Sequence, residues 1–302
     1  MYSHVKLSKI KYIKYILKLA FIIVILLYIN LYLLSPFNKK NKNIRDPQDI
    51  FYHRKTYIEA HRGMNREIFQ NTIESFQKAI QYNIDSLETD VWLTKDKVLV
   101  LVHGGNYDSN IESLYGVPGN VTDYTYTELS TFRTVNDSLK MPTLKEAMKL
   151  TKNKIFLDLE IKDPRVDLVF PYIIKLIEKY DFFNQISLSS FHHDYYYKIM
   201  EYNKKYDKNL IFGFLYHVNE SNYDFTKNGS FLGIYHKNIT RRMCKKAHSN
   251  GMAILAWFGM FAKEKKFIYN KLFNYKVDAI CSNEALKAQK FRDYYYKKRN
   301  YR

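Results

Sequence analysis

Short apolar runs alternate with segments of helical length between Thr56 and Glu284. Eight of these runs have the length and composition of strands buried in a parallel sheet: Tyr57–Ala60, Ser86–Val91, Ile155–Ile161, Ile186–Ser190, Leu210–Leu215, Phe231–Tyr235, Ala253–Phe258 and Ala279–Ser282. Helical segments fall between most of them: Asn71–Tyr82, Leu144–Thr151, Val166–Tyr180, Asp194–Lys205, Thr240–Ser249 and Ala262–Asn274. Eight such units predict an α/β fold of the TIM (β/α)8 barrel type, with a doubly wound sheet as the alternative.

One further apolar run, Val98–Val102, is joined to the second predicted strand by only Thr94–Lys97. A parallel crossover needs a dozen or more residues, so this pair predicts an antiparallel hairpin. The returning run then brings His103 back beside residues 88–90.

The N-terminal region contains a long apolar segment, Leu19–Leu34, which reads LAFIIVILLYINLYLL. With its margins, at residues 19–37, it reaches the roughly 20 residues that span a bilayer. The following SPFNKKNK lacks the small residues of a signal-peptide cleavage site. The pattern favours a single uncleaved transmembrane helix over a cleaved signal peptide or a buried helix.

Basic residues flank this segment on both sides, so the positive-inside rule favours a cytoplasmic N-terminus only slightly. Five Asn-x-Ser/Thr sequons follow the segment. We therefore expect a single-pass membrane protein with a lumenal or extracellular body, and its orientation stays open.

The net charge of +18 is concentrated at the two ends of the chain. Residues 1–55 hold 11 basic and 2 acidic side chains, and residues 286–302 hold 7 and 1. The nearly neutral middle argues against a nucleic-acid-binding domain, and the basic ends suit anionic lipid phosphates. The predicted organisation begins with a basic segment at residues 1–18, an anchor at 19–37 and a basic linker at 38–55. The α/β domain follows at 56–285 and a basic tail at 286–302.

The chain has two cysteines, Cys244 and Cys281. Two are too few for a disulfide-stapled scaffold or for a zinc site built on cysteines, and sequence leaves their pairing open.

Charged residues follow two of the predicted strands at a spacing of two. Because residues i and i+2 share a face of a strand, Glu88 and Asp90 point together, and so do Asp158, Glu160 and Lys162. In a barrel, polar side chains near the carboxyl ends of strands are typical of catalytic groups. Carboxylate oxygens are the ligands of hard divalent cations, so these strands predict a site for Ca²⁺ or Mg²⁺.

Two histidines are expected to lie at this site. His61 follows the first strand in EAHRG, and the hairpin brings His103 toward the carboxylates. Two imidazoles beside a metal are suited to phosphodiester hydrolysis, in which one activates a nucleophile and the other protonates the leaving alkoxide.

These residues belong to a set of motifs that resembles the glycerophosphodiester phosphodiesterases, from about Thr56 to Glu284. The motifs appear in order as AHRG, QNTIESFQKAIQYNIDSLETDVWLTKD, VLVLVHG, MPTLKEAMKL, FLDLEIK, SLSSF, ILAWF and VDAICSNEA. The resemblance implies a TIM barrel and metal-dependent hydrolysis of a glycerophosphodiester to an alcohol and glycerol 3-phosphate, in lipid metabolism.

The resemblance also implies roles for individual residues. His61 and His103 resemble the family's general acid and base, without showing which is which. The residues that resemble its metal ligands are Glu88, Asp90 and Glu160. Arg62 and Lys162 resemble its phosphate contacts, and Trp257 resembles an aromatic residue that lines its pocket. The segment from Gly104 to Lys140 resembles an insertion that covers the mouth.

Three positions depart from the family pattern. Gln70 replaces a supporting glutamate, Gly104 replaces an aspartate after the second histidine, and a late motif has become Ser282–Ala285. The retained histidines and carboxylates favour an active hydrolase. The alternatives are a lysophospholipase D that acts on lysophospholipids, and a catalytically silent, membrane-tethered binder of phosphate or lipid.

Overall fold

Eight parallel strands close into a barrel in the computed structural model, which describes residues 55–105 and 108–300. Around the barrel the strands are β1 (Tyr57–Ala60), β9 (Ala279–Ser282), β8 (Ala253–Trp257), β7 (Phe231–Tyr235), β6 (Ile211–Leu215), β5 (Ile186–Ser190), β4 (Phe156–Ile161) and β2 (Ser86–Leu93). β2 pairs again with β1, so the sheet has no parallel edge. The predicted TIM barrel is therefore confirmed, and the doubly wound alternative is excluded.

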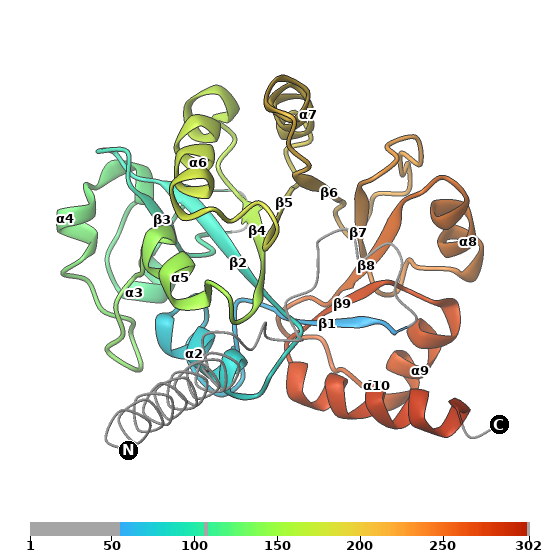
Figure 1. The fold of residues 1–302 in the computed structure, drawn as a ribbon. Coiled ribbons are helices and arrows are strands. Elements are labelled where there is room, and N and C mark those ends of the chain that lie inside the picture. Colours follow the sequence, from blue (N-terminus) through green and yellow to red (C-terminus); the bar gives the residue numbers. More distant parts are fainter. Residues whose placement is uncertain (1–54, 106–107, 301–302) are drawn as a thin grey trace, which may run out of the picture. The chain divides into compact units, whose positions relative to one another are not determined.

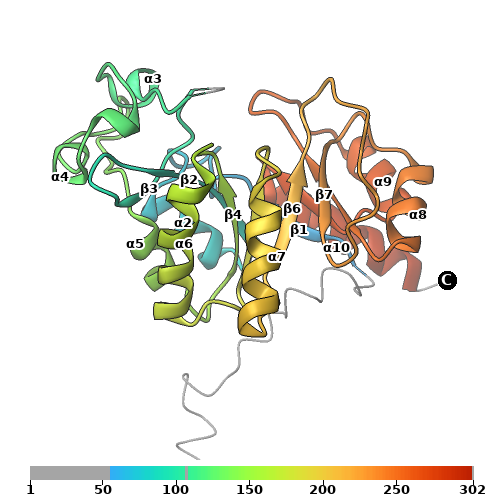
Figure 2. The same cartoon turned by 90° about the horizontal axis from the view of Figure 1, so that it is seen from above.

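Helices cover the outside of the ring of strands (Figures 1 and 2). They are α2 (Ile73–Gln81), α5 (Leu144–Thr151), α6 (Val166–Tyr180), α7 (Tyr195–Tyr206), α8 (Arg241–Ser249) and α9 (Lys266–Tyr275). Capping threonines define several starts: Thr72 and Thr143 each accept the backbone N–H three residues on. Helix α9 starts four residues later than expected, because the residue before its N-cap, Glu264, hydrogen-bonds into the barrel at Asn283.

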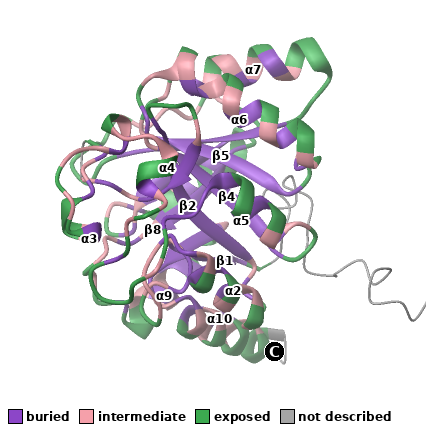
Figure 3. Ribbon diagram, turned by 90° about the vertical axis from the view of Figure 1, so that its left-hand side faces the viewer, coloured by how far each residue is buried: buried purple, intermediate pink, exposed green. Residues whose placement is uncertain are grey.

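The strands are buried on both faces, as Figure 3 shows in purple. One face packs under the helices, and the other fills the barrel interior. Full burial explains why the strands appear in the sequence as continuous apolar runs and not as alternating ones. It also means that any charged residue on a strand must be paired or functional.

The predicted hairpin is confirmed. β3 (Leu99–Leu101) pairs antiparallel with β2, and the backbone N–H of Val102 donates to the Asp90 carbonyl at 3.1 Å. The segment after it carries α3 (Glu112–Tyr115), the 3-10 helix η2 (Val121–Asp123) and α4 (Tyr126–Leu129). It packs its own apolar cluster against the hairpin: Trp92, Val100, Val102, Ile111, Tyr115, Val121, Leu129 and Met141.

The segment predicted as a basic tail is helical over most of its length. Residues 285–300 form helix α10 (Ala285–Asn300), which packs near the start of β1. The Thr56 N–H donates to the Tyr296 hydroxyl at 3.2 Å, and Arg292 pairs with Asp85. The segment is rich in charge and lacks an apolar stripe, so its sequence alone did not indicate a packed helix.

The predicted basic segment 1–18, the predicted anchor 19–37 and the linker up to residue 54 lie outside the described residues. In the described ranges, 55–105 and 108–300, no helix combines the length and apolar character needed to cross a bilayer.

Candidate active site

Three buried carboxylates meet where β2 and β4 run side by side. The parallel register places Glu88 beside Asp158 and Asp90 beside Glu160. One oxygen from each of Glu88, Asp90 and Glu160 lies within 4.8 Å of the others. The i, i+2 reasoning therefore placed these side chains on the correct face, and the register of the two strands brings them together.

This cluster fits a hard divalent cation. Glu88 Oε1 and Asp90 Oδ1 are buried without a hydrogen-bond partner in the described chain. Burial and the neighbouring carboxylates raise the pKa of Glu88 well above its usual range, and burial also raises the pKa of Glu160. Crowded carboxylates with unused oxygens are the donor set that Ca²⁺ or Mg²⁺ binds.

A tight turn after β1 holds Arg62 against the cluster. Arg62 and Gly63 have positive φ angles of 56° and 81°, and a Cβ on Gly63 would lie 2.3 Å from the Ser75 hydroxyl oxygen. In this turn the Arg62 N–H donates to Glu88 Oε2 at 2.8 Å. Its Nε lies 3.2 Å from Asp90 Oδ2. The positive charge therefore sits directly on the carboxylates.

Asp90 is the most strongly held carboxylate of the cluster. Burial alone would raise its pKa, but the Arg62 guanidinium, together with His103 and Lys162, holds the pKa of Asp90 below its usual range. Asn71 adds a hydrogen bond from Nδ2 to Asp90 Oδ2 at 2.8 Å and is itself fixed by Thr89. Asp90 stays ionised and oriented.

The hydrogen bonds around His61 determine its tautomer. Asn283 Nδ2 donates to Gly259 and Glu264, and Asn283 Oδ1 accepts from Asn65, so the amide orientation is settled. The His61 Nδ1, 2.8 Å from Asn283 Oδ1, must therefore carry the proton. Burial and the nearby Arg62 lower the pKa of His61 to about 3. His61 is thus a neutral imidazole with a free Nε2 lone pair.

His103 stands at the end of the hairpin in the same state. Its Nδ1 donates to the Gly104 carbonyl at 3.0 Å, and its Nε2 lies 3.4 Å from the Lys162 ammonium. Burial lowers the pKa of His103 to about 4, and the cations Arg62 and Lys162 oppose its protonation further. Lys162 is paired with Glu160 at 3.1 Å. Burial alone would lower the pKa of Lys162, but the negative charges of Glu160 and Asp90 raise it.

A cavity of about 500 Å³ opens above these groups. Seven of the eight predicted site residues line it, and Asp90 is fully buried beside them. Trp257 and Phe191 form an aromatic wall, with their ring centroids 6.4 Å apart. Ser113 and Leu114 from the segment after the hairpin also line the cavity, as expected for an insertion at the mouth.

The three departures from the family pattern have local substitutes. Gln70 Oε1 accepts from Arg62 Nη1 at 2.7 Å. The backbone carbonyl of Gly104 still accepts a hydrogen bond from His103 Nδ1, although glycine brings no side chain to this position. Asn283, from the altered late motif, orients His61. Each replacement keeps a hydrogen bond where a carboxylate was expected.

Sequence reasoning missed the buried carboxylate that supports Asn283. Glu264 is 2% exposed and accepts hydrogen bonds from the Asn283 backbone and side chain. It lies in FAKEKK, at the start of the predicted helix Ala262–Asn274, where nothing distinguished it from the neighbouring lysines.

A second carboxyl pair, Glu59 and Asp158, lies in the barrel interior and was given no role. Glu59 accepts from Ser86 at 3.0 Å and Asp158 from Ser187 at 2.7 Å. Burial, with the nearby Asp158, raises the pKa of Glu59 to about 8, and burial raises the pKa of Asp158 to about 7. The sequence signal that could have found this pair is again a spacing of two residues along a strand: Glu59 precedes His61, and Asp158 precedes Glu160.

The fold and the site define a class of protein: a TIM barrel whose cavity holds an acidic cluster, able to bind a cation, together with two neutral histidines. The chain matches the model of the glycerophosphoryl diester phosphodiesterase family over residues 61–287 and belongs to that family. The predicted family and the predicted enzyme class, phosphoric diester hydrolase, are thereby confirmed.

Curated relatives agree with this assignment. The chain is 34% identical over 173 residues to a glycerophosphodiester phosphodiesterase of Caldanaerobacter subterraneus, an alignment that covers 54% of this chain and 67% of that protein. It is 30% identical over 148 residues to a glycerophosphodiester phosphodiesterase of Bacillus altitudinis, covering 46% and 59%. It is also 27% identical over 135 residues to human lysophospholipase D GDPD1, covering 40% and 41%.

Solved structures share the fold. A glycerophosphodiester phosphodiesterase from Parabacteroides distasonis superimposes with a TM-score of 0.66 at 22% identity, covering 83% of this chain and 99% of that one. A phosphodiesterase from Oleispira antarctica, solved in complex with the product sn-glycerol-3-phosphate, gives 0.66 at 20% identity, covering 80% and 99%.

Proposed function

We propose that the protein hydrolyses a glycerophosphodiester to an alcohol and glycerol 3-phosphate with the help of a divalent cation. The observation that carries this proposal is the meeting of Glu88, Asp90 and Glu160 beside one cavity that His61 and His103 also line. The printed names of the relatives above support the substrate class. A retained and fully supported set of groups favours hydrolysis over silent binding of phosphate or lipid.

The cation would be held by Glu88, Asp90 and Glu160. All three are oxygen donors, which favours Ca²⁺ or Mg²⁺ over thiophilic metals at this position. When bound, the cation polarises the phosphoryl group and stabilises the charge that develops in the transition state. Arg62 contributes a fixed positive charge to the same region and holds Asp90 in place.

The two histidines are suited to proton transfer. Both carry their proton on Nδ1, where Asn283 and Gly104 accept it, and both present Nε2 toward the site. One Nε2 takes the proton from the attacking group and later returns it to solvent. The other imidazole takes a proton from solvent on its Nε2 and gives it to the leaving alkoxide oxygen. The depressed pKa values of about 3 and about 4 keep both rings neutral at rest.

Lys162 is placed to stabilise the phosphate. Its ammonium lies between Glu160 and His103 and lines the cavity. A preorganised cation at this point favours the extra negative charge of the transition state. Trp257, which also lines the cavity, would shape the pocket for the substrate's organic part.

Lysophospholipids are the second candidate substrates, because the cavity wall continues into apolar side chains. Phe191, Met260 and Phe261 line the cavity with Trp257, and Phe261 is 91% exposed. An exposed aromatic at the rim suits an acyl chain or a lipid surface. The human relative named as a lysophospholipase D supports this option.

We also propose that the protein acts at a membrane in lipid metabolism, as a single-pass protein with a lumenal or extracellular body. The apolar segment at residues 19–37 and its basic flanks support this location. Carbonate extraction and protease protection of the full-length protein in vesicles would test it: extraction into the soluble fraction would contradict the anchor.

One assay tests the proposed reaction. Full-length protein is incubated with glycerophosphocholine or lysophosphatidylcholine after EDTA treatment, and then with added Ca²⁺ or Mg²⁺. We expect cation-dependent release of choline from at least one substrate, and the phosphorus product shows which bond is cleaved. A folded preparation that releases nothing from either substrate with either cation would refute the hydrolase proposal.

A further inference from the structure

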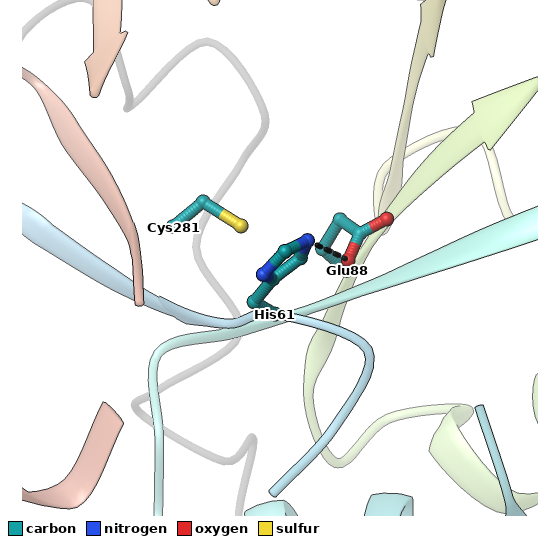
Figure 4. A group of neighbouring side chains, drawn as sticks. All are labelled: His61, Glu88 and Cys281. Atoms are coloured by element: carbon teal, nitrogen blue, oxygen red, sulfur yellow. Dashed lines mark ion pairs between the residues drawn. The ribbon is translucent and has the colours of Figure 1, made fainter. Parts of the chain in front are cut away.

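A second group of potential metal ligands shares Glu88 with the acidic cluster. His61, Glu88 and Cys281 are buried, and one ligand atom from each lies within 4.8 Å of the others. Figure 4 shows the three side chains converging, with the 4.0 Å approach of His61 Nε2 to Glu88 Oε2 drawn as a dashed line. The proposed hydrolysis uses His61 and Glu88 but gives Cys281 no task.

The position of Cys281 follows from the strand register. It lies on β9 opposite Glu59 of β1, and it packs among the residues of the barrel interior. The whole residue is 3% exposed, and its thiol forms no disulfide. A thiol in the interior, two residues before Asn283, is therefore held close to the ring of His61.

The other two donors are prepared for a cation. Asn283 fixes the His61 proton on Nδ1, which leaves Nε2 as a lone-pair donor, 4.0 Å from Glu88 Oε2. Metal-bound histidines commonly donate the other ring N–H to such a partner. Glu88 Oε2 accepts from the Arg62 N–H, while Glu88 Oε1 is buried and unpartnered. That oxygen already belongs to the acidic cluster, so the second site is defined by the convergence of its three donor atoms.

The chemistry of this donor set differs from that of the acidic cluster. One sulfur, one nitrogen and one oxygen suit Zn²⁺ or Cd²⁺, whereas three carboxylates suit Ca²⁺ or Mg²⁺. Bonds to Zn²⁺ of about 2.0–2.3 Å require the three side chains to draw together slightly. When the cation binds, the metal–sulfur bond forms as the S–H bond breaks, and the thiol proton leaves to solvent.

We infer that His61, Glu88 and Cys281 form a binding site for a thiophilic divalent cation, and that its occupancy inhibits the hydrolase. Inhibition follows because a metal on His61 Nε2 occupies the lone pair that proton transfer needs. The binding site stands on geometry alone, and only the inhibitory effect rests on the proposed function.

Cadmium binding tests the site directly. Full-length protein is titrated with Cd²⁺, and the sulfur-to-cadmium charge-transfer band in the ultraviolet is recorded. Because the chain has only Cys244 and Cys281, a band in Cys244→Ser must come from Cys281. We expect the band in wild type and in Cys244→Ser, and its loss in Cys281→Ser and Cys281→Val. Absence of the band from wild type or from folded Cys244→Ser overturns the site, even if the Cys281 variants do not fold.

Inhibition is measured separately, at saturating Ca²⁺ or Mg²⁺, as the Zn²⁺ concentration that halves each variant's own rate. In Cys281→Ser this concentration should rise more than about tenfold. Loss of a metal ligand should weaken metal binding at least as much as loss of an outer-shell partner of a ligand does. Cys244→Ser, altered at the other buried thiol, should match wild type. Equal Zn²⁺ sensitivity in Cys281→Ser and wild type overturns the inhibitory role. If no variant shows any hydrolase activity, the cadmium band still decides the site.

Discussion

The two sides of the barrel interior are built from different chemistry. The side formed by β1, β2 and β4 carries five buried carboxyl groups: Glu59, Glu88, Asp90, Asp158 and Glu160. The side formed by β6, β7, β8 and β9 is lined by apolar residues, including Ile211, Leu215, Phe231, Ala253 and Leu255. Both sides share one backbone architecture, so the difference comes from side chains alone.

The acidic side is stabilised by a network of its own side chains. Arg62, Lys162 and Asn71 pair with carboxylates, and hydroxyls of the strands donate to Glu59 and Asp158. The apolar side is stabilised by close packing, in which a glycine on one strand makes room for a large side chain from the next strand. A Cβ on Gly213 would lie 2.1 Å from the Phe231 ring. Mutations should therefore affect activity on the acidic side and stability on the apolar side.

The largest expected effect is on the acidic side, at a proposed cation ligand. Glu160→Gln removes one of three carboxylates, so kcat/KM should fall more than about 1,000-fold, which corresponds to several kcal/mol of transition-state stabilisation. Steady-state kinetics over a range of Ca²⁺ or Mg²⁺ concentrations measure the change. Glu201→Gln, on the exposed face of α7, is the control and should behave as wild type. A folded Glu160→Gln enzyme of normal activity would contradict the proposed ligand role.

Removing a proposed proton-transfer group should have the next largest effect. His61→Ala should lower kcat by about 10²–10⁴-fold, the usual contribution of general acid or base catalysis. Kinetics at saturating substrate measure it, with circular dichroism as a check on folding. His248→Gln serves as the matched control, because His248 lies on α8 outside the cavity. If both variants lost activity equally, the assignment of His61 would be wrong.

On the apolar side, Gly213→Ala tests packing. The new methyl group meets the Phe231 ring, so the free energy of unfolding should fall by about 1–3 kcal/mol. Urea denaturation measures this change. Gly259→Ala is the control, since a Cβ there meets nothing within 4 Å and the backbone angle is ordinary. A smaller loss in Gly213→Ala than in Gly259→Ala would show that the interior there is not tightly packed.

The smallest expected effect is a pH dependence of stability beneath the apolar side. His248 Nε2 lies 2.9 Å from Asp278 Oδ2, and this hydrogen bond raises the pKa of His248. The stabilisation is therefore complete below the unfolded pKa of about 6.5 and is lost as pH rises through the higher folded pKa. The half-exposed pair should contribute no more than about 1 kcal/mol.

Urea denaturation of wild type and His248→Gln at several pH values between about 6 and 8 isolates this contribution. Burial also raises the pKa of Asp278, but that effect is common to both proteins. The stability difference should shrink as pH rises. A difference that is constant across this range would mean that the pair does not titrate there.

Much of the acidic side could be predicted before the structure. The spacing of two placed Glu88 with Asp90 and Glu160 with Lys162, and the short hairpin connection returned His103 to them. These are local consequences of strand geometry. The family resemblance supplied Arg62, and the structure adds that this residue is paired with Asp90.

The parts that could not be predicted depend on contacts between distant residues. Asn283 reaches His61 across 222 positions, and it depends on Glu264, which nothing in the sequence distinguished from the neighbouring lysines. The approach of Cys281 to His61 and Glu88 likewise requires the barrel to close between its first and last strands. Helix α10 packs at the start of β1 although its sequence has no apolar stripe.

By itself the sequence determined the order of strands and helices, the barrel class and the identity of the charged groups, because these follow from periodicity, spacing and motif along the chain. Tertiary structure alone decided which tautomer His61 adopts, which carboxyl groups have raised pKa values and where the thiol of Cys281 lies. These properties depend on closure of the sheet, which sets burial and neighbours for side chains that are far apart in sequence.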